Sequence, residues 1–427
     1  MKHNQVTNNG IIEGIIWKQL LIFFFPMLFG TFFQQMYNTA DAIIVGKFVG
    51  KEALSAVGGP TGAIINMFVN FFVGMSTGAT VIISQYYGGN NEEDVSKAVH
   101  TSIALAIWGG TVITIIGILS ASIALKLMGT PEDIMTESLV YLRIYFIGMV
   151  PIFLYNMGAG ILRAVGDSKR PLYYLIACSF INITLVLLFI VIFKLGVGGA
   201  AVATIIAHIF SAVFVYLYLK RTNEGYRLNR KVIRLDKEML KKIMQIGLPA
   251  GFQSLMYSIS NIIIQANINS FGTDSIAAWA AYSKIDGIYW LIMASFGVSI
   301  TTFVGQNYGA KKFTRVKRGI NICLAMTLSL SALLSLILYF GSSSFLSFFT
   351  NDINVIKIGV VMVQIMVPAY FTYVFIEIYS GALRGMGNSL MPMLLTGIGV
   401  CVFRILWIFN MLPVWHELKT VIMSYPL

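Results

Sequence analysis

Three acidic residues stand inside long apolar stretches of this sequence, where an ionised side chain is energetically costly. They are Asp41, Asp286 and Glu377. Burial away from water favours the neutral, protonated form of a carboxyl group, and the charged form attracts cations. The chemistry expected of these residues is therefore the reversible binding of a proton or a cation.

Asp41 is the clearest of these candidates, because other polar residues share its helix face. The spacing i, i+3, i+4, i+7 places four side chains on one face. An uncharged lipid environment disfavours such a stripe, so we expect it to face the interior of a helical bundle. The alternative is a buried structural carboxylate. The four residues are Gln34, Tyr37, Asn38 and Asp41.

Glu377 also shares a helix face with polar residues, namely Tyr370, Tyr373 and Arg384. It is a second candidate for ion or substrate binding, and Asp286 is a third. For Glu377 the alternative is an internal ion pair with Arg404 or Lys284, which would only hold this part of the chain together.

The elements that position these acids must be membrane-spanning helices. The chain has 427 residues, 57% hydrophobic and 11% charged, whereas soluble domains carry about 25% charged residues. Eleven apolar runs reach the roughly 20 residues that a spanning helix needs. The predicted spans are 18–45, 54–83, 97–125, 137–161, 171–193, 198–219, 243–270, 276–305, 319–347, 355–382 and 391–412.

The basic residues predict the orientation. They concentrate in alternate loops, above all in 220–242 and 311–318. Because cytoplasmic loops carry the excess of Lys and Arg, we expect a multi-pass protein of the plasma membrane with a cytoplasmic N-terminus. The formal charge of +12 then reflects topology and contact with anionic lipid, so no nucleic-acid partner is expected.

The chain is also internally repeated. Segments 160–171 and 381–392 are identical at six of twelve positions, at an offset of 221 residues. The same offset aligns Gln85 and Gly88 with Gln306 and Gly309. Since each copy holds six helices, an even number, the copies have the same orientation and are related by an axis along the membrane normal.

The repeat predicts an all-α fold of two parallel six-helix bundles. The expected boundaries are an N-terminal lobe 1–221, a cytoplasmic linker 222–239 and a C-terminal lobe 240–427, with a central cleft between the lobes. The offset also predicts a twelfth helix near 419–440, so we expect the sequence to be truncated within its last helix.

The paired loops of the repeat, together with the segment 306–310, resemble the multidrug and toxic compound extrusion (MATE) family. The resemblance covers essentially the whole chain. It implies a secondary antiporter that exports organic cations and other amphipathic compounds in exchange for protons or sodium ions by alternating access.

The resemblance also implies roles for particular residues. Asp41 matches the family's acid in helix 1 that binds the coupling ion, with Tyr37 on the same face. Asn182 and Thr204 match two polar residues around that acid, but Val186 stands where the family often has a second acid. One carboxylate with neutral oxygens is a weak sodium site, so proton coupling is favoured. In the C-terminal lobe the candidate cavity residues are Glu377, Asp286, Tyr373, Gln253, Tyr257 and Asn261.

Other functions are less well supported by the residues. A lipid-linked saccharide flippase of the same superfamily is one alternative, and an integral membrane enzyme is another. An enzyme would need a cluster of nucleophiles, histidines or metal ligands, but Cys178, Cys323 and Cys401 are isolated and the four histidines are scattered. We therefore expect no enzymatic activity and no cofactor or bound metal apart from the coupling ion. The expected partners are small amphipathic molecules and lipid, with the protein a monomer.

Overall fold

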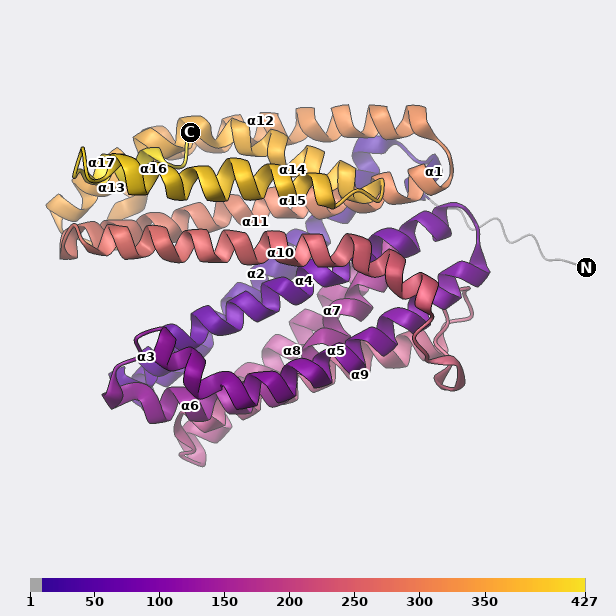
Figure 1. The fold of residues 1–427 in the computed structure, drawn as a ribbon, viewed down its shortest axis with the longest axis horizontal. Helices are drawn as coiled ribbons and strands as arrows, with labels where there is room; N and C mark the ends of the chain where they lie inside the picture. The colour runs from indigo at the N-terminus through magenta and orange to yellow at the C-terminus, as the bar shows by residue number, and fades with distance from the viewer. Residues whose placement is uncertain (1–9, 427) are drawn as a thin grey trace, which may run out of the picture. The chain divides into compact units, whose positions relative to one another are not determined.

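The computed structural model describes residues 10–426 and is helical, with no β-strand in that range. Most helices are long because apolar residues run through them for many turns (Figure 1). Their bounds, in chain order, are α1 Gly10–Glu13, α2 Ile16–Phe48, α3 Lys51–Gly58, α4 Pro60–Gly88, α5 Glu92–Leu127, α6 Glu132–Ile147, α7 Met149–Ala164, α8 Lys169–Leu187, α9 Gly196–Arg221, α10 Lys237–Asn269, α11 Thr273–Gly309, α12 Phe313–Ser347, α13 Ile353–Met366, α14 Tyr370–Gly385, α15 Leu390–Thr396, α16 Phe403–Met411 and α17 Leu418–Met423.

Several predicted spans are divided in the structure. The run 137–161 forms α6 and α7, which meet at an angle of 49° around Gly148. The run 355–382 forms α13 and α14, joined by a 3-10 turn that contains Pro368. The run 171–193 ends in a π-helical turn, Leu188–Ile192 after α8, and the run 391–412 is interrupted by another, Gly397–Val402 between α15 and α16.

Length and apolarity identify nine membrane-spanning helices in the described residues, or ten if α6 and α7 form one span. The remaining predicted span, 243–270, is the helix α10. It has 33 residues and is long enough to cross a bilayer. It lies outside the set because its amide and hydroxyl side chains, such as Gln253 and Asn261, dilute its apolar character. The N-terminal end itself, predicted to be cytoplasmic, lies outside the described residues.

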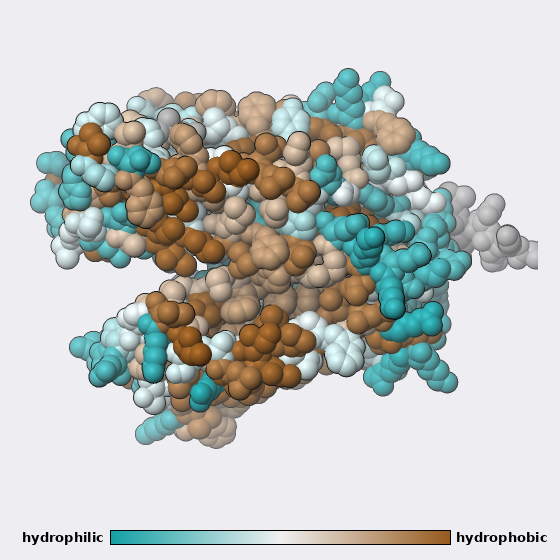
Figure 2. Space-filling model, in the orientation of Figure 1, coloured by the Kyte–Doolittle hydropathy of each residue, from teal (hydrophilic) through white to brown (hydrophobic). Residues whose placement is uncertain are grey.

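The outer surfaces of the helices are apolar. Large side chains such as Leu119 and Phe340 are 74% and 81% exposed. Figure 2 shows hydrophobic residues over the middle of the helices and hydrophilic residues gathered near their ends. A water-exposed surface of this kind would be unfavourable, so these faces are the ones that contact lipid.

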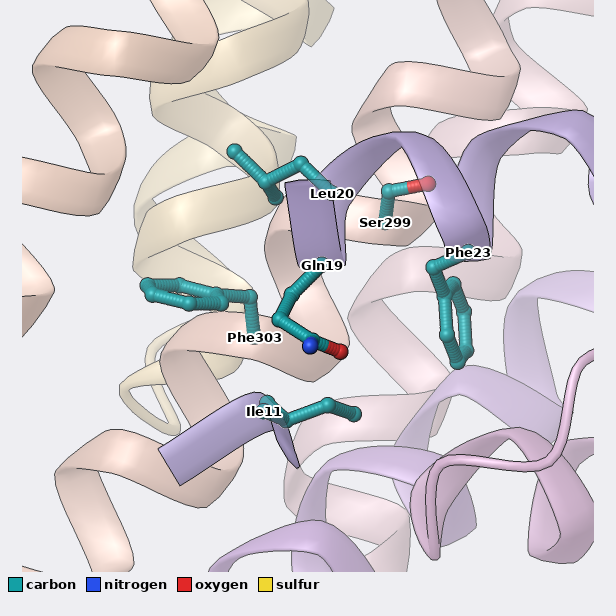
Figure 3. Close-up of a pocket in the computed structure, with 6 residues that line it drawn as sticks. All are labelled: Ile11, Gln19, Leu20, Phe23, Ser299 and Phe303. Carbon is teal, nitrogen blue, oxygen red and sulfur yellow. The ribbon is translucent and has the colours of Figure 1, made fainter. Parts of the chain in front are cut away.

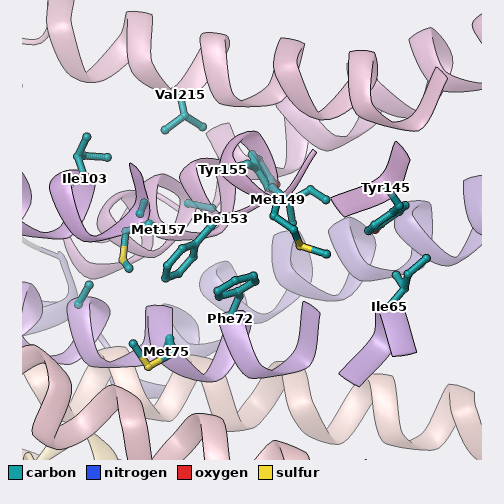
Figure 4. Packing of buried hydrophobic residues seen from close by; sticks show 14 of the residues in the cluster. Ile65, Phe72, Met75, Ile103, Tyr145, Met149, Phe153, Tyr155, Met157 and Val215 are labelled. Atoms are coloured by element: carbon teal, nitrogen blue, oxygen red, sulfur yellow. The ribbon is translucent and has the colours of Figure 1, made fainter. Parts of the chain in front are cut away.

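Contacts divide the chain into two compact units: Met1–Phe24 with Phe252–Leu427, and Phe25–Gly251. The predicted lobe boundaries lie elsewhere, at the linker, and remain a prediction. The larger core belongs to the unit 25–251 (Figure 4), where Phe72 of α4 stacks on Phe153 of α7 at 4.2 Å between ring centroids.

The sequence repeat recurs as matching close approaches between helices. In one unit a Cβ atom on Gly160 of α7 would lie 3.3 Å from the backbone carbonyl oxygen of Ser76 on α4. In the other a Cβ on Gly381 of α14 would meet the carbonyl oxygen of Gly297 on α11 at 2.8 Å. These glycines allow equivalent helix pairs to touch through their backbones, as small residues do in membrane proteins.

Candidate functional site

Asp41 lies on α2 and contacts two other helices of the unit 25–251. The amide nitrogen of Asn182, on α8, faces its carboxylate and donates to Oδ1 at 2.8 Å and to Oδ2 at 3.2 Å. The hydroxyl of Thr204, on α9, lies within hydrogen-bonding distance of the same carboxylate. The other end of the Asn182 amide lies 3.3 Å from Thr204 Oγ1. The structure thus brings together three residues that are far apart in sequence.

Asp41 is half-buried, whereas Asn182 and Thr204 are buried. Its hydrogen-bond partners are neutral. Within residues 10–426, Asp41 forms no ion pair with a lysine, arginine or histidine. The negative charge is therefore stabilised by two dipoles and not balanced by a neighbouring cation, which leaves the site able to accept a proton or a cation.

Three tyrosines surround the carboxylate. Tyr37, one turn before Asp41, is buried and hydrogen-bonds the Gln34 side chain. Tyr141 and Tyr145 of α6 are also buried and interact electrostatically with Asp41. Sequence reasoning missed the last two, although their i, i+4 spacing on a predicted helix is the kind of signal that would reveal them.

The polar face of α2 is narrower than predicted. Tyr37 is buried and Gln34 and Asp41 are partly buried, but Asn38 is exposed and its amide donates to Gln35 Oε1 at 3.4 Å. The expectation that the whole stripe faces inward is wrong for Asn38. A four-residue stripe covers a wide arc of the helix, and its edge lies beyond the neighbouring helices.

Asp286 of α11 accepts three hydrogen bonds from aromatic residues. Tyr370 Oη donates to Oδ1 at 2.5 Å, Tyr282 Oη donates to Oδ1 at 3.2 Å, and Trp290 Nε1 donates to Oδ2 at 2.9 Å. Tyr282 and Trp290 lie one turn before and after Asp286 on the same helix, and Tyr370 comes from α14. The carboxylate joins α11 to α14.

Glu377 of α14 has a partner of opposite charge. Tyr373 Oη donates to Oε2 at 2.9 Å, and Arg384 Nη2 lies 3.8 Å from Oε1. The carboxylate occupies the space beside Gly297, where a Cβ atom would lie 1.8 Å from Oε1. Glu377 is therefore an ion-paired acid packed against the backbone of α11.

The predicted alternative partners of Glu377 are wrong. Lys284 is exposed, and the guanidinium of Arg404 stacks on the ring of Tyr425 at 3.9 Å. Arg384, which the sequence placed on the same helix face, is the residue that pairs with Glu377. It follows Glu377 by two turns on the same helix face, so the pairing is local.

The remaining predicted site residues of the C-terminal half, Gln253, Tyr257 and Asn261, differ in how far they are buried. Gln253 donates to Thr396 Oγ1 at 2.8 Å and is buried, while Asn261 is exposed. The ring centroids of Tyr257 and Trp290 are 6.4 Å apart, and those of Trp290 and Tyr373 are 4.0 Å apart. Trp290 thereby connects the surroundings of Asp286 and Glu377.

The two halves of the chain each match the same known family. A sequence model of the MatE family matches residues 26–188 and again residues 249–409. Together these segments cover most of the chain. The chain belongs to the MATE family of multidrug efflux transporters.

Relatives of this MATE transporter carry names of the same kind. The probable multidrug resistance protein YoeA of Bacillus subtilis is 29% identical over 384 residues, which cover 88% of this chain and 83% of the relative. The probable multidrug resistance protein NorM of Thermotoga maritima is 26% identical over 398 residues, which cover 91% of this chain and 84% of the relative.

Solved structures show the same fold. A MOP superfamily transporter from Pyrococcus furiosus superposes with a TM-score of 0.90 at 21% identity, covering 98% of this chain and 94% of that one. A crystal structure of a MATE P26A mutant gives a TM-score of 0.89 at 22% identity, with the same coverage. The helical fold of this transporter, with its two repeated halves, is therefore that of MATE proteins.

A small cavity lies in the unit that contains the start of α2 together with α11 (Figure 3). Its lining side chains come from α1, the start of α2 and α11, and most are apolar. None of the acidic candidates contributes to it. The lining residues are Ile11, Gln19, Leu20, Phe23, Ser299 and Phe303.

Proposed function

We propose that this MATE transporter is a proton-coupled antiporter, which exports organic cations and other amphipathic compounds across the plasma membrane. The proposal includes a cytoplasmic N-terminus, as the distribution of Lys and Arg predicts. Asp41 is the residue that binds the coupling proton. The observation that carries the proposal is the environment of Asp41, a partly buried carboxylate with neutral donors and no ion-pair partner among the described residues.

Protonation would change the contacts of α2. The charged carboxylate accepts hydrogen bonds from Asn182, with the Thr204 hydroxyl close by. Hydrogen bonds to a charged group are stronger than those to a neutral one. Neutral Asp41 holds α8 and α9 less tightly, so a different arrangement of these helices becomes more populated. A cationic substrate favours the arrangement in which Asp41 is charged. Proton and substrate then bind different states, as exchange requires.

The choice of proton over sodium rests on the number of charged oxygens. Sodium is a hard cation and prefers several oxygen ligands, including carboxylates. Around Asp41 the nearest donors are neutral, and Val186, one turn after Asn182, is fully buried and apolar. A proton needs only one carboxylate.

The aromatic cluster of the other half supports a role in substrate binding. Tyr257, Trp290 and Tyr373 pack against one another, and the last two donate hydrogen bonds to the carboxylates of Asp286 and Glu377. Aromatic faces attract organic cations, by about 0.5–2 kcal/mol for each good contact. We assign this cluster to recognition of the cationic part of the substrate.

The test uses inverted membrane vesicles that contain the transporter and a fluorescent lipophilic cation. A pH gradient and a sodium gradient are imposed separately, on the parent and on Asp41→Asn. We expect transport under the pH gradient only, and its loss in Asp41→Asn. The matched control is Glu52→Gln, which neutralises an exposed acid of the same unit and should transport like the parent.

Two results would contradict the proposal. Transport driven by sodium alone would keep the antiporter and reverse the assignment of the ion. Absence of transport under either gradient, with intact protein in the vesicles, would favour the flippase alternative.

A further inference from the structure

A histidine outside the candidate site holds the linker between the two halves of the chain. His100 lies in the third turn of α5 and is only 4% exposed. Its Nε2 accepts a hydrogen bond from the backbone N–H of Asn229 at 2.9 Å. Its Nδ1 lies 2.7 Å from the backbone carbonyl oxygen of Ser96. One imidazole therefore bridges α5 and a linker residue 129 positions away.

These two contacts define the protonation state of the ring. A carbonyl oxygen only accepts, so Nδ1 must carry a proton. A backbone N–H only donates, so Nε2 must be unprotonated. The neutral Nδ1–H tautomer satisfies both contacts. A second proton on Nε2 would point at the N–H of Asn229, break that hydrogen bond and leave a buried cation.

We propose that His100 is a second proton-binding site, separate from Asp41, whose occupation releases the linker from α5. Histidine is the side chain that ordinarily changes charge between pH 5 and 8. The site lies at the membrane face predicted to be cytoplasmic. A fall in pH on that side would therefore free the linker, and it would do so whatever ion drives transport.

The charges around the ring do not offset a proton on it. Lys97, one turn before His100 on the same side of α5, is paired with Glu93 at 2.7 Å and approaches Asp94 at 3.7 Å. From α10, Lys242 donates to Tyr86 of α4 at 2.8 Å. The linker contributes one cation and one acid to the pocket that His100 also lines. The pocket residues are Ser96, Lys97, His100, Thr101, Val232, Arg234 and Asp236.

Asp236, the acidic residue of this pocket, already takes part in another hydrogen bond. The Asp236 carboxylate accepts the N–H of Met239 at 2.9 Å and so caps the first turn of α10. The N–H of Asp236 donates to Thr101 Oγ1 at 3.4 Å. The linker is thus tied to neighbouring residues of α5 at both Asn229 and Asp236. Loss of the first tie loosens the segment that leads into α10, the first helix of the second half.

The experiment measures amide hydrogen exchange of the linker in lipid nanodiscs between pH 7.5 and 5.5. Rates are divided by those of an unfolded reference peptide at each pH, which removes the intrinsic dependence on pH. For the parent we expect protection of the peptide around Asn229 to fall severalfold between pH 7.5 and 5.5, because a ring protonated on both nitrogens cannot accept the N–H of Asn229. Unchanged protection in the parent would overturn the proposal.

Substitutions separate proton binding from simple packing. In His100→Gln the side-chain oxygen accepts from Asn229 at every pH, so protection should stay high throughout. In His100→Ala the tie is absent, so protection should be low throughout. His416→Gln, which removes an exposed histidine stacked on Phe271, should keep the pH dependence of the parent. Persistence of that dependence in His100→Gln would also overturn the proposal.

Discussion

The acids of the two halves are stabilised in different ways. In the first half Asp41 accepts from Asn182, with the Thr204 hydroxyl close by, and no cation balances its charge among the described residues. In the second half Glu377 lies 3.8 Å from Arg384, and aromatic N–H and O–H groups surround Asp286. A carboxylate without a countercharge responds strongly to a proton or cation, while a paired one has its charge already compensated.

The repeat shows that this difference is specific to each half. At an offset of 221 the counterpart of Glu377 is Asn156, which donates to the carbonyl oxygen of Ile152 on its own helix at 2.9 Å. The counterpart of Gly297 is Ser76, whose side chain has no carboxylate to avoid. Equivalent positions of one scaffold thus hold a neutral amide in one half and an ion pair in the other. We infer that the first half couples the ion and the second half recognises substrate.

The largest effect should distinguish Asp41 from Glu377. Asp41→Asn is expected to reduce transport driven by a pH gradient to the level of empty vesicles, because the proton-binding group is lost. Glu377→Gln should keep coupling to the gradient and weaken the apparent affinity for cationic substrates. The measurement is initial uptake rate against substrate concentration in inverted vesicles. Loss of coupling in Glu377→Gln, with Asp41→Asn active, would reverse the assignment of the halves.

A smaller effect is expected from Asn182→Ala. It removes a hydrogen bond to a charged group, worth about 1.5–3 kcal/mol, and so should slow transport by about tenfold or more. The matched control is Asn156→Ala, since Asn156 bonds only its own helix and should transport like the parent. Equal loss in both variants would show that the amides act through helix packing.

Exchanging one half's residues for the other's tests the role of Gly297. Gly297→Ser places a side chain where Glu377 lies, and overpacking of this kind costs about 1–3 kcal/mol. Adding Glu377→Asn recreates the pair Ser76 and Asn156 of the first half. The double variant should recover most of the stability lost in Gly297→Ser. Thermal unfolding in detergent provides the measurement. Gly287→Ser, at a position of α11 with open space around it, is the control, and equal destabilisation there would contradict the explanation.

The smallest effect is expected from Arg384→Gln. The pair with Glu377 is long and both side chains are partly exposed, at 18% and 16%, so its loss should cost about 0.5–1 kcal/mol. In the background of Glu377→Gln the same substitution should cost less. A double-mutant cycle from thermal unfolding measures the coupling, and a coupling energy of zero would show that the two charges do not interact.

Most of the fold could be predicted because it depends on local composition. Runs of about 20 apolar residues identify spans without knowledge of neighbours, and the repeat relates one half to the other. The prediction was less accurate where a span is interrupted without a proline at the break, as at the π-helical turns Leu188–Ile192 and Gly397–Val402. Such breaks depend on which neighbouring groups satisfy the freed backbone.

The sequence by itself determined that this is a helical membrane protein with two repeated halves, and it identified the three acids, since charge inside an apolar run is visible without coordinates. Only the tertiary structure decided their partners. The contacts of Asp41 with Asn182, and of His100 with Asn229, join residues more than a hundred positions apart. A hydrogen bond requires atoms within about 3 Å in a favourable direction, and the packing of the helices alone sets those distances.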